Sequence, residues 1–470
     1  MNSTDTFLRN QHMTSQNTPA FSPSATNSLE ENQPKKYILV LDGVRAIACL
    51  AVLAFHMNLV STGFHLWQPL LSIHTVIGTL TYFATSIAWF GESGVILFFL
   101  LSGFLLFLPF AKALLFDSPW PSLRRFYIRR IFRILPGYYA ALFLIALFIH
   151  PQFLSPVNWH YLWIFLTFQM NFALSQYING PFWTLAIEFQ FYLLLPILAW
   201  LFSLLVRRGT TRWRLLKLTF CLFLMIAWGL FTRYWSVYIS NTSTSDFLIP
   251  HRVSIALIPY IYSDTGRYSE VFAVGMLACM VYTYTQYAPS RPSWHTWMHR
   301  LSPLMLTMGL ALFSFLCFWH FYFIDITPRY FATFPRSYVV FPLLDPHILR
   351  IVIHHWGELQ ALGYALSYGF CLLTLLYGST KLKRLFECSL LRWIASISFS
   401  LYMWHLPFLG IFGNVVGHNL QRQGWSPLAE YGVLWCWTLV VIIPVSAMLY
   451  RWIEQPGIRV GEWLISKLER

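Results

Sequence analysis

The first strongly apolar segment of the chain opens with Leu41-Asp42-Gly43-Val44-Arg45 and runs on to Phe55-His56. It is long enough to cross a bilayer as a helix, yet it carries Asp42, Arg45 and His56. A charged side chain at membrane depth costs roughly 3 kcal/mol or more, so such residues face a cavity or a partner. Arg45 and His56 lie eleven positions apart. On a helix this spacing puts both on one face, about 16 Å apart along the axis. This polar face predicts a functional site.

The composition indicates an all-α, polytopic integral membrane protein. The 470 residues are 57% hydrophobic and only 11% charged, whereas soluble domains have about 25% charged residues. Many apolar runs have the length of a membrane helix, and their period is not the strict alternation of an outer-membrane barrel. We therefore expect about ten transmembrane helices in a lipid bilayer.

The predicted spans and the charges between them give the chain an orientation. The ten spans lie at 38–60, 90–115, 134–150, 183–206, 213–236, 268–287, 301–323, 359–378, 394–415 and 431–452. With the N-terminus inside, the inner connections hold 24 of the 32 Lys and Arg residues and the outer connections hold 6. Because Lys and Arg collect on cytoplasmic loops, we expect a multi-pass protein of the cell (plasma) membrane with both termini cytoplasmic.

Three further parts of the chain complete the predicted organisation. Residues 1–34 are rich in Ser, Thr, Asn, Gln and Pro and have no apolar run, which predicts a disordered cytoplasmic tail and no signal peptide. Residues 35–460 form the transmembrane domain, and 461–470 form a cytoplasmic C-terminal tail. The apolar segments 70–89 and 157–174 are interpreted as outer-surface or re-entrant pieces, since counting either as a span would reverse every later loop.

Charge and cysteine content exclude two other classes of protein. The net charge of +14 follows from the basic inner loops, so we expect no nucleic-acid binding. The seven cysteines contain no Cys-x-x-Cys pair, which gives neither a disulfide framework nor a zinc signature. Adjacent His354 and His355, followed by Glu358, superficially suggest a metal site, but adjacent side chains point to different faces. We expect no metal.

An arginine cluster lies in one inner loop. It consists of Arg124, Arg125, Arg129, Arg130 and Arg133. Such a cluster can fix the membrane topology, or it can bind phosphate, because guanidinium groups form paired hydrogen bonds with phosphate oxygens. Arg130 and Arg133 are one helical turn apart, so together they can grip one anionic ligand.

Other polar residues within the spans are candidates for a substrate channel. Ser102 beside Gly103 serves either close helix packing or a channel wall. The fourth span opens with three polar groups, Glu188, Gln190 and Tyr192. Glu188 is either a hydrogen-bonded structural acid or the group that orients an imidazole. His405 is a second intramembrane histidine, and it is either a satisfied core residue or a functional one.

These stretches together resemble the acyltransferase 3 family of membrane acyltransferases. Arg45 and His56 fit its R-x10-H pattern, and Arg130 to Arg133 fit its RxxR pattern. Four further stretches are similar to family motifs: Phe98-Phe99-Leu100-Leu101-Ser102-Gly103, Trp183 to Tyr192, Ser400 to Pro407 and Tyr450 to Pro456. The matches run in family order across about residues 38–460. Two acids that the family often carries are replaced here by Ile96 and Phe189, and Glu92 is a possible substitute for the first.

The resemblance implies an acyl-CoA donor, most often acetyl-CoA, and a hydroxyl acceptor on a cell-surface carbohydrate. Under this reading Arg129, Arg130, Arg133 and Arg45 hold the CoA phosphates. His56 acts as a general base or a transient acyl carrier, and Glu188 orients it. The channel is lined by Ser102, Tyr192, Gln190 and His405.

The main rival is a transporter or flippase for a lipid-linked sugar. That class also has many spans, intramembrane charges and long aromatic outer loops. Transporters often show internal repeats with paired broken helices, and the chain shows no such repeat. The acceptor, the acyl chain length and the oligomeric state are left open by the sequence.

Overall fold

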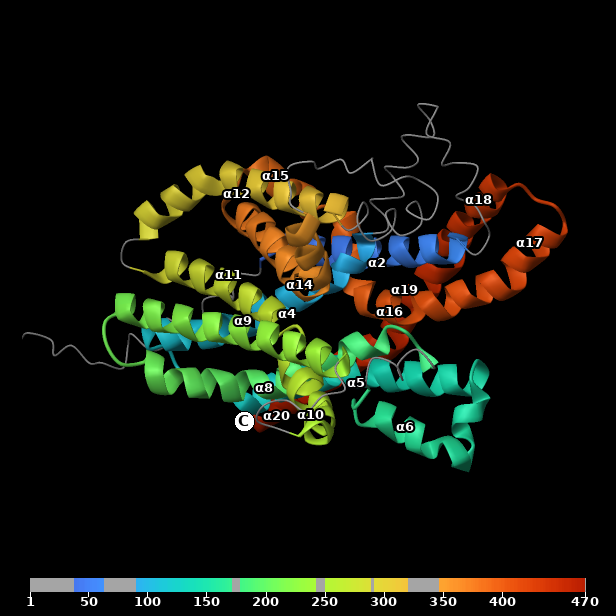
Figure 1. Cartoon of the computed structure of the whole chain (residues 1–470), viewed down its shortest axis with the longest axis horizontal. Coiled ribbons are helices and arrows are strands. Elements are labelled where there is room, and N and C mark those ends of the chain that lie inside the picture. Colours follow the sequence, from blue (N-terminus) through green and yellow to red (C-terminus); the bar gives the residue numbers. More distant parts are fainter. Residues whose placement is uncertain are drawn as a thin grey trace, which may run out of the picture. The chain divides into compact units, whose positions relative to one another are not determined.

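The computed structural model of the chain describes residues 38–62, 90–170, 178–241, 250–288, 291–319 and 346–469. Within these ranges the chain is built from helices, with no strand (Figure 1). The predicted tail 1–34 and the apolar segment 70–89 lie outside the described residues. The side chains of His354, His355 and Glu358 also lie outside them.

The predicted spans correspond to helices of the structure. They are α2 (Val40–Thr62), α4 (Gly94–Phe116) after the short η1 (Phe90–Ser93), α5 (Leu123–Phe148), α8 (Phe182–Val206), α9 (Thr211–Asn241), α11 (Ser269–Tyr287), α12 (Arg291–Trp319), α14 (Pro346–Tyr377), α16 (Ser389–Ile411), and a last span built from α18 (Pro427–Trp437), η7 (Thr438–Ile442), α19 (Ile443–Leu449) and η8 (Tyr450–Glu454). Among the described residues, 9 helices are long and apolar enough to cross a membrane.

The predicted span that is not among these nine is the sixth, α11, which has 19 residues, most of them buried. Its polar residues lower its mean hydropathy, but most of its side chains are buried against neighbouring helices rather than exposed to lipid. A helix that is surrounded by protein does not need a fully apolar surface. The segment around 157–170 forms only the eight-residue α6 (Trp159–Leu166), which is too short to cross a bilayer.

Helix α4 lies at the centre of the described bundle and packs closely on α11. Gly103 of α4 lies against the backbone of Phe272, and Gly275 of α11 lies against the backbone of Leu100. A Cβ at either glycine would overlap a carbonyl oxygen of the other helix. Small residues at such crossings allow two membrane helices to approach closely. The packing role considered for the Ser102-Gly103 pair is therefore confirmed for Gly103.

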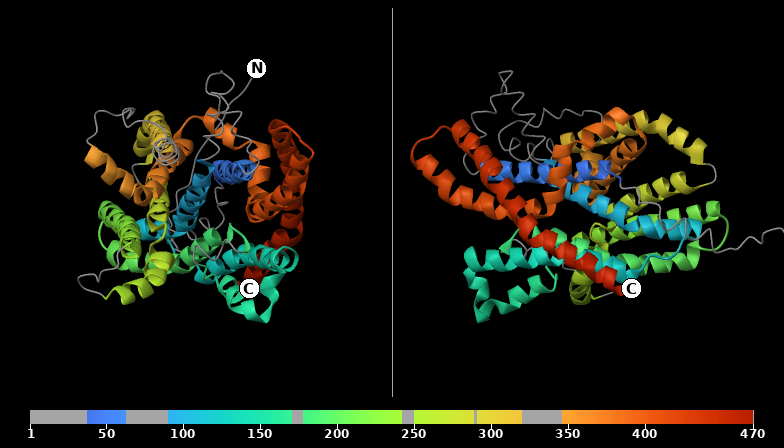
Figure 2. Two further views of the ribbon diagram at one scale, coloured as in Figure 1. Left: turned by 45° about the vertical axis from the view of Figure 1, so that its right-hand side comes forward. Right: turned by 180° about the vertical axis from the view of Figure 1, so that it is seen from behind.

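Helix α2 is fixed against two other parts of the chain. It packs along α16 and against η1, as the blue and orange-red helices in Figure 2 show. Gly43 lies against the backbone of Phe386, and Gly91 of η1 lies against the backbone of Ala51. These close contacts orient the α2 face that carries Arg45 and His56.

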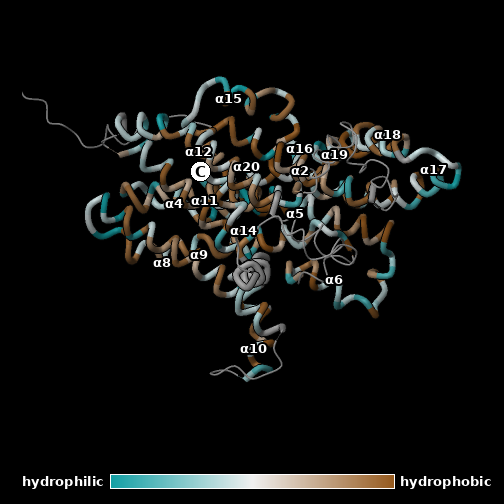
Figure 3. Tube along the Cα trace, turned by 45° about the horizontal axis from the view of Figure 1, so that its top comes forward, coloured by the Kyte–Doolittle hydropathy of each residue, from teal (hydrophilic) through white to brown (hydrophobic). Residues whose placement is uncertain are grey.

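The residues expected to form a C-terminal tail belong instead to α20 (Gln455–Leu468). This helix is amphipathic and packs on α5, with Gly457 and Gly461 directly against Phe132. The glycines at a four-residue spacing form its packing face, and the cytoplasmic position of 461–470 stays a prediction. Hydrophilic residues gather in Figure 3 at turns between helices, for example near α15 (Thr380–Phe386) and α17 (His418–Arg422).

Candidate active site

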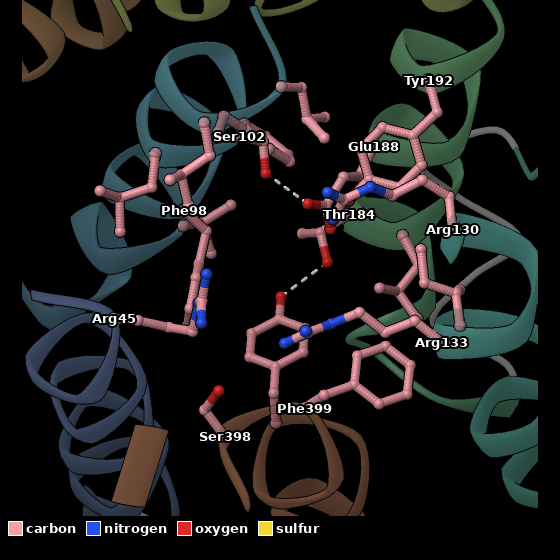
Figure 4. A pocket seen from close by; sticks show the side chains of 18 residues that line it. Arg45, Phe98, Ser102, Arg130, Arg133, Thr184, Glu188, Tyr192, Ser398 and Phe399 are labelled. Atoms are coloured by element: carbon pink, nitrogen blue, oxygen red, sulfur yellow. Dashed lines mark hydrogen bonds between the residues drawn. The ribbon is translucent and has the colours of Figure 1, made fainter. Parts of the chain in front are cut away.

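Five helices enclose a polar cavity of about 100 Å³ inside the described bundle. The helices are α2, α4, α5, α8 and α16, and each contributes side chains that point inward (Figure 4). The cavity brings together six of the residues that the sequence singled out: Arg45, Ser102, Arg130, Arg133, Glu188 and Tyr192. These residues come from four different helices, so the cavity exists only in the folded protein.

Helix α5 supplies two of the three guanidinium groups. The helix begins after Ser122, whose side chain accepts a hydrogen bond of 3.4 Å from the Arg125 amide. Arg130 and Arg133 then reach the cavity from successive turns. The Arg130 Nε is buried and has no hydrogen-bond partner in the described part of the chain. A buried donor without a partner is costly unless a ligand or water satisfies it, so this part of the cavity is suited to an anion.

Arg129 is separated from this pair. A one-residue step turns a helical side chain by about 100°, and Arg129 points to α20. There it forms an ion pair of 3.1 Å with Glu462, and both side chains are substantially exposed. We expected Arg129 to bind the CoA phosphates together with Arg130 and Arg133, but the structure places it outside the cavity.

Glu188 faces α4 across the cavity. Ser102 donates a hydrogen bond to its carboxylate, and Tyr192, one turn further along α8, lines the same cavity. Figure 4 shows the Ser102 contact as a dashed line. His56 makes its hydrogen bonds elsewhere, so the expected pairing of Glu188 with His56 is not what the described residues show. Glu188 instead orders the cavity wall between α4 and α8.

Arg45 enters the cavity from α2 (Figure 4). Asp42 lies one turn before it, with a separation of 3.7 Å between the charged groups. Asp42 does not line the cavity. The acid is therefore the local partner of Arg45, which lowers the cost of placing this cation inside the bundle.

His56 and His405 form a histidine pair beside the cavity. The Nε2 of His405 lies 3.1 Å from the Nδ1 of His56. Each Nδ1 also faces a backbone carbonyl: that of His56 lies 2.9 Å from Val52 O, and that of His405 lies 2.8 Å from Tyr402 O. A carbonyl only accepts, so each Nδ1 carries the proton in the neutral rings. The His405 Nε2 is then an acceptor for His56, and the lone pair of the His56 Nε2 remains for chemistry.

Tyr402 connects this pair to the cavity. Its ring lies 5.8 Å from that of His405, and its hydroxyl is 2.8 Å from that of Thr184. Both Tyr402 and Thr184 line the cavity. Sequence reasoning missed these two residues, although both lie in stretches that carried the family resemblance.

Two further polar residues lie outside this cavity: Gln190, which was predicted to line the channel, and Glu454, which was not singled out. Gln190 lines a separate apolar cavity on the other side of α8, so it does not join Ser102 and Tyr192. Glu454 is buried and accepts a hydrogen bond from Ser400, which links η8 to α16. The sequence feature that could have identified Glu454 is its position in the closing stretch Tyr450 to Pro456, which is similar to a family motif. Among the described residues, no cluster of three His, Cys, Asp or Glu side chains could hold a metal.

The described helices are long and apolar enough to cross a membrane, and they hold an internal site of three arginines and an acid beside a histidine pair. These features define the class as a polytopic membrane protein with a polar site inside its bundle. The family model for the acyltransferase domain, acyltransferase 3, matches residues 38–450. The chain belongs to this family.

Named relatives agree with this assignment. The peptidoglycan O-acetyltransferase OatA of Listeria monocytogenes is 25% identical over 442 residues, which cover 90% of this chain and 56% of the relative. A Staphylococcus aureus (strain COL) protein that carries the name of an O-acetyltransferase is 22% identical over 478 residues, covering 93% and 61%. The chain thus spans only about three fifths of the length of these relatives. No solved structure matches it significantly.

Proposed function

We propose that the protein transfers an acyl group, most often acetyl, from cytoplasmic acyl-CoA to a hydroxyl of a cell-surface carbohydrate. The observation that carries the proposal is the cavity in which Arg45, Arg130 and Arg133 converge beside the His56–His405 pair. The family and the names of the relatives support O-acetylation. The donor, its side of the membrane and the acceptor are part of the proposal.

The arginines suit the donor. CoA carries several phosphates, and guanidinium groups bind phosphate through paired hydrogen bonds. Arg130 has a buried nitrogen without a partner, and Arg133 lies one turn away on α5. These two residues would hold the phosphates, and Arg45 would add a third positive group further along the route to His56. The cytoplasmic orientation of this end rests on the distribution of Lys and Arg between the loops.

His56 would act as the general base. Its Nε2 lone pair takes the proton of the acceptor hydroxyl while the hydroxyl oxygen attacks the thioester carbonyl. The tetrahedral intermediate collapses, the C–S bond breaks, and the imidazolium returns the proton to the leaving thiolate. His405 accepts a hydrogen bond from the His56 Nδ1 and would stabilise the imidazolium. A transient acyl-His56 intermediate is the other route that uses the same nitrogen.

Labelled acetyl-CoA supplied to the cytoplasmic face of membrane vesicles tests the proposal. We expect label on surface glycan with the unchanged protein and a loss of at least about a hundredfold with His56→Ala, the scale of a lost general base. The control is His299→Gln, because His299 also bonds a carbonyl, Tyr377 O at 2.7 Å, but lies on α12 away from the cavity. Full transfer by His56→Ala would overturn the proposal. Movement of a lipid-linked sugar without any transfer of label would favour the flippase reading.

A further inference from the structure

A second cavity, of about 330 Å³, opens at the start of α4. It is lined by η1, α4, α8, α9 and α14 and by Tyr268, the residue before α11, and none of the predicted site residues belongs to it. Its lining residues include Glu92, Ser93, Trp183, Arg233, Tyr268 and Gln360. Val95 of α4 lines both this cavity and the arginine cavity, so the two spaces share one wall. We call it the Arg233 cavity.

Arg233, which lines this cavity, belongs to a buried ion pair. Arg233 is 7% exposed and Glu270 is 0% exposed, and the two side chains are joined by an ion pair. Gly229 and Gly266 make room for it, because a Cβ at Gly229 would overlap Glu270 and one at Gly266 would overlap Thr232. The Arg233 Nε is buried without a hydrogen-bond partner in the described residues. Burying such a pair gains little stability by itself, which points to a functional reason for it.

Tyr268 provides an independent sign of function. Its φ of 60° is in the left-handed region, which is unfavourable for a residue with a bulky side chain. Such strain persists where the surroundings enforce it, and it is concentrated at ligand sites. The conformation brings the Tyr268 ring next to Arg233, at 5.2 Å, and stacks it on Trp183, at 5.9 Å. The ring pair and the guanidinium group therefore form one built surface.

Two series of contacts connect the Arg233 cavity to helix α2 and to the arginine cavity. Its wall residues Phe90, Glu92 and Ser93 belong to η1. A Cβ on Gly91 of η1 would lie against Ala51 and Phe55 of α2, and His56 follows Phe55 directly. On the α8 side, Trp183 of this cavity precedes Thr184 of the arginine cavity. Both walls thus connect the second cavity to the proposed chemistry.

We propose that the Arg233 cavity binds the hydroxyl-bearing acceptor as a sugar ring. This inference rests on the proposed function and adds the place of the acceptor to it. Planar polar side chains, here Arg233, Glu92 and Gln360, can donate to and accept from neighbouring hydroxyls, and the aromatic rings offer an apolar face.

The charges and the volume favour a sugar over the alternatives. Glu270 balances Arg233. The negative charge of Glu92 offsets the positive charge of Arg267, which lies 4.8 Å from the Trp183 ring and 5.6 Å from the Tyr268 ring. The site therefore has no excess positive charge to select a phosphate or another strong anion. An acyl chain would leave the buried Arg233 Nε without a hydrogen-bond partner. The volume is at the lower end of the range of small-ligand sites and suits one sugar residue of a longer glycan.

Direct binding in lipid nanodiscs tests this inference. The probe is a soluble glycan-strand fragment of alternating N-acetylglucosamine and N-acetylmuramic acid, and acetyl-CoA binding is measured in parallel. The variants are Gln360→Ala and the double variant Arg233→Met with Glu270→Gln, which removes both buried charges together. Gln190→Ala is the matched control, since Gln190 lines a different cavity.

We expect both Arg233-cavity variants to weaken glycan binding at least tenfold, to leave acetyl-CoA binding within twofold, and the control to change neither. Unchanged glycan binding by these variants would overturn the inference, and so would a wild-type protein that does not bind the glycan. A parallel loss of acetyl-CoA binding would also overturn it. The proposed function fails separately, through full transfer by His56→Ala, so the two failures are distinguishable.

Discussion

Removing one member of the Arg233–Glu270 pair should destabilise the protein far more than removing both. The side chains are 9% and 0% exposed, and they lie on different helices. Glu270→Gln leaves a buried guanidinium without its counter-charge, and a single partner lost from a buried pair costs about 3–5 kcal/mol. We therefore expect each of the single variants Glu270→Gln and Arg233→Met to lose stability on this scale.

The double variant should recover most of the loss. A buried pair that is replaced by neutral side chains of similar volume is often close to neutral in stability, because the desolvation cost of both charges disappears. The coupling energy of the double-mutant cycle is then about 3 kcal/mol or more. The matched control is the exposed Arg129–Glu462 pair, with 39% and 53% exposed side chains, for which we expect a coupling of about 0–1 kcal/mol.

The assay is reversible unfolding in mixed micelles, followed by tryptophan fluorescence, with the four proteins of each cycle measured at the same lipid and detergent composition. Thermal inactivation in nanodiscs gives an independent ranking. Single variants within about 1 kcal/mol of the wild type would refute the reasoning, because surface substitutions have effects of that size. Equal losses in the single and double variants would refute it as well.

Three further outcomes follow from the cavity and its packing. Arg133→Gln should raise the KM for acetyl-CoA at least tenfold, whereas Arg129→Gln should change it less than twofold; steady-state kinetics in vesicles checks both. His405→Ala should lower kcat by about 10- to 100-fold, as the loss of a supporting hydrogen bond does, and should leave the KM for acetyl-CoA unchanged. A kcat of this variant equal to that of the wild type would contradict the assigned tautomers of His56 and His405. Gly103→Val should prevent the close α4–α11 contact and so lower the yield of monodisperse protein on size exclusion. A normal yield would contradict this packing argument.

The spans could be predicted because each depends on a local property of the chain. Ten apolar segments of membrane length gave ten helices, including the polar and enclosed α11. The C-terminal helix α20 was missed because its glycine face makes sense only against α5. Local hydropathy indicates which segments enter a membrane, but it does not show which surface each helix presents to its neighbours.

The candidate site was only partly predictable for the same reason. Arg130 and Arg133 were paired correctly, since one helical turn joins them. The Ser102–Glu188 contact joins residues 86 positions apart, and the His56–His405 contact joins residues 349 positions apart. Such distances in sequence are closed by tertiary packing, and helical periodicity carries no information about them.

The departure at Ile96 has a structural answer. Ile96 and Glu92 both line the Arg233 cavity, and a spacing of four residues puts them on one side of the helical segment that joins η1 to α4. The structure thus places a carboxylate in the cavity that Ile96 also lines. That Glu92 takes the place of the acid that the family often carries stays a prediction.

Helix α2 connects the two halves of the proposed reaction. Arg45 faces the arginine cavity, and His56 lies about 16 Å further along the same helix face. His56 follows Phe55, the α2 residue that Gly91 of η1 approaches. A donor held at its phosphates near Arg130 must therefore extend its thioester toward His56, while a sugar in the Arg233 cavity approaches from the opposite side of Val95. Two cavities that share a wall give the donor and the acceptor separate places.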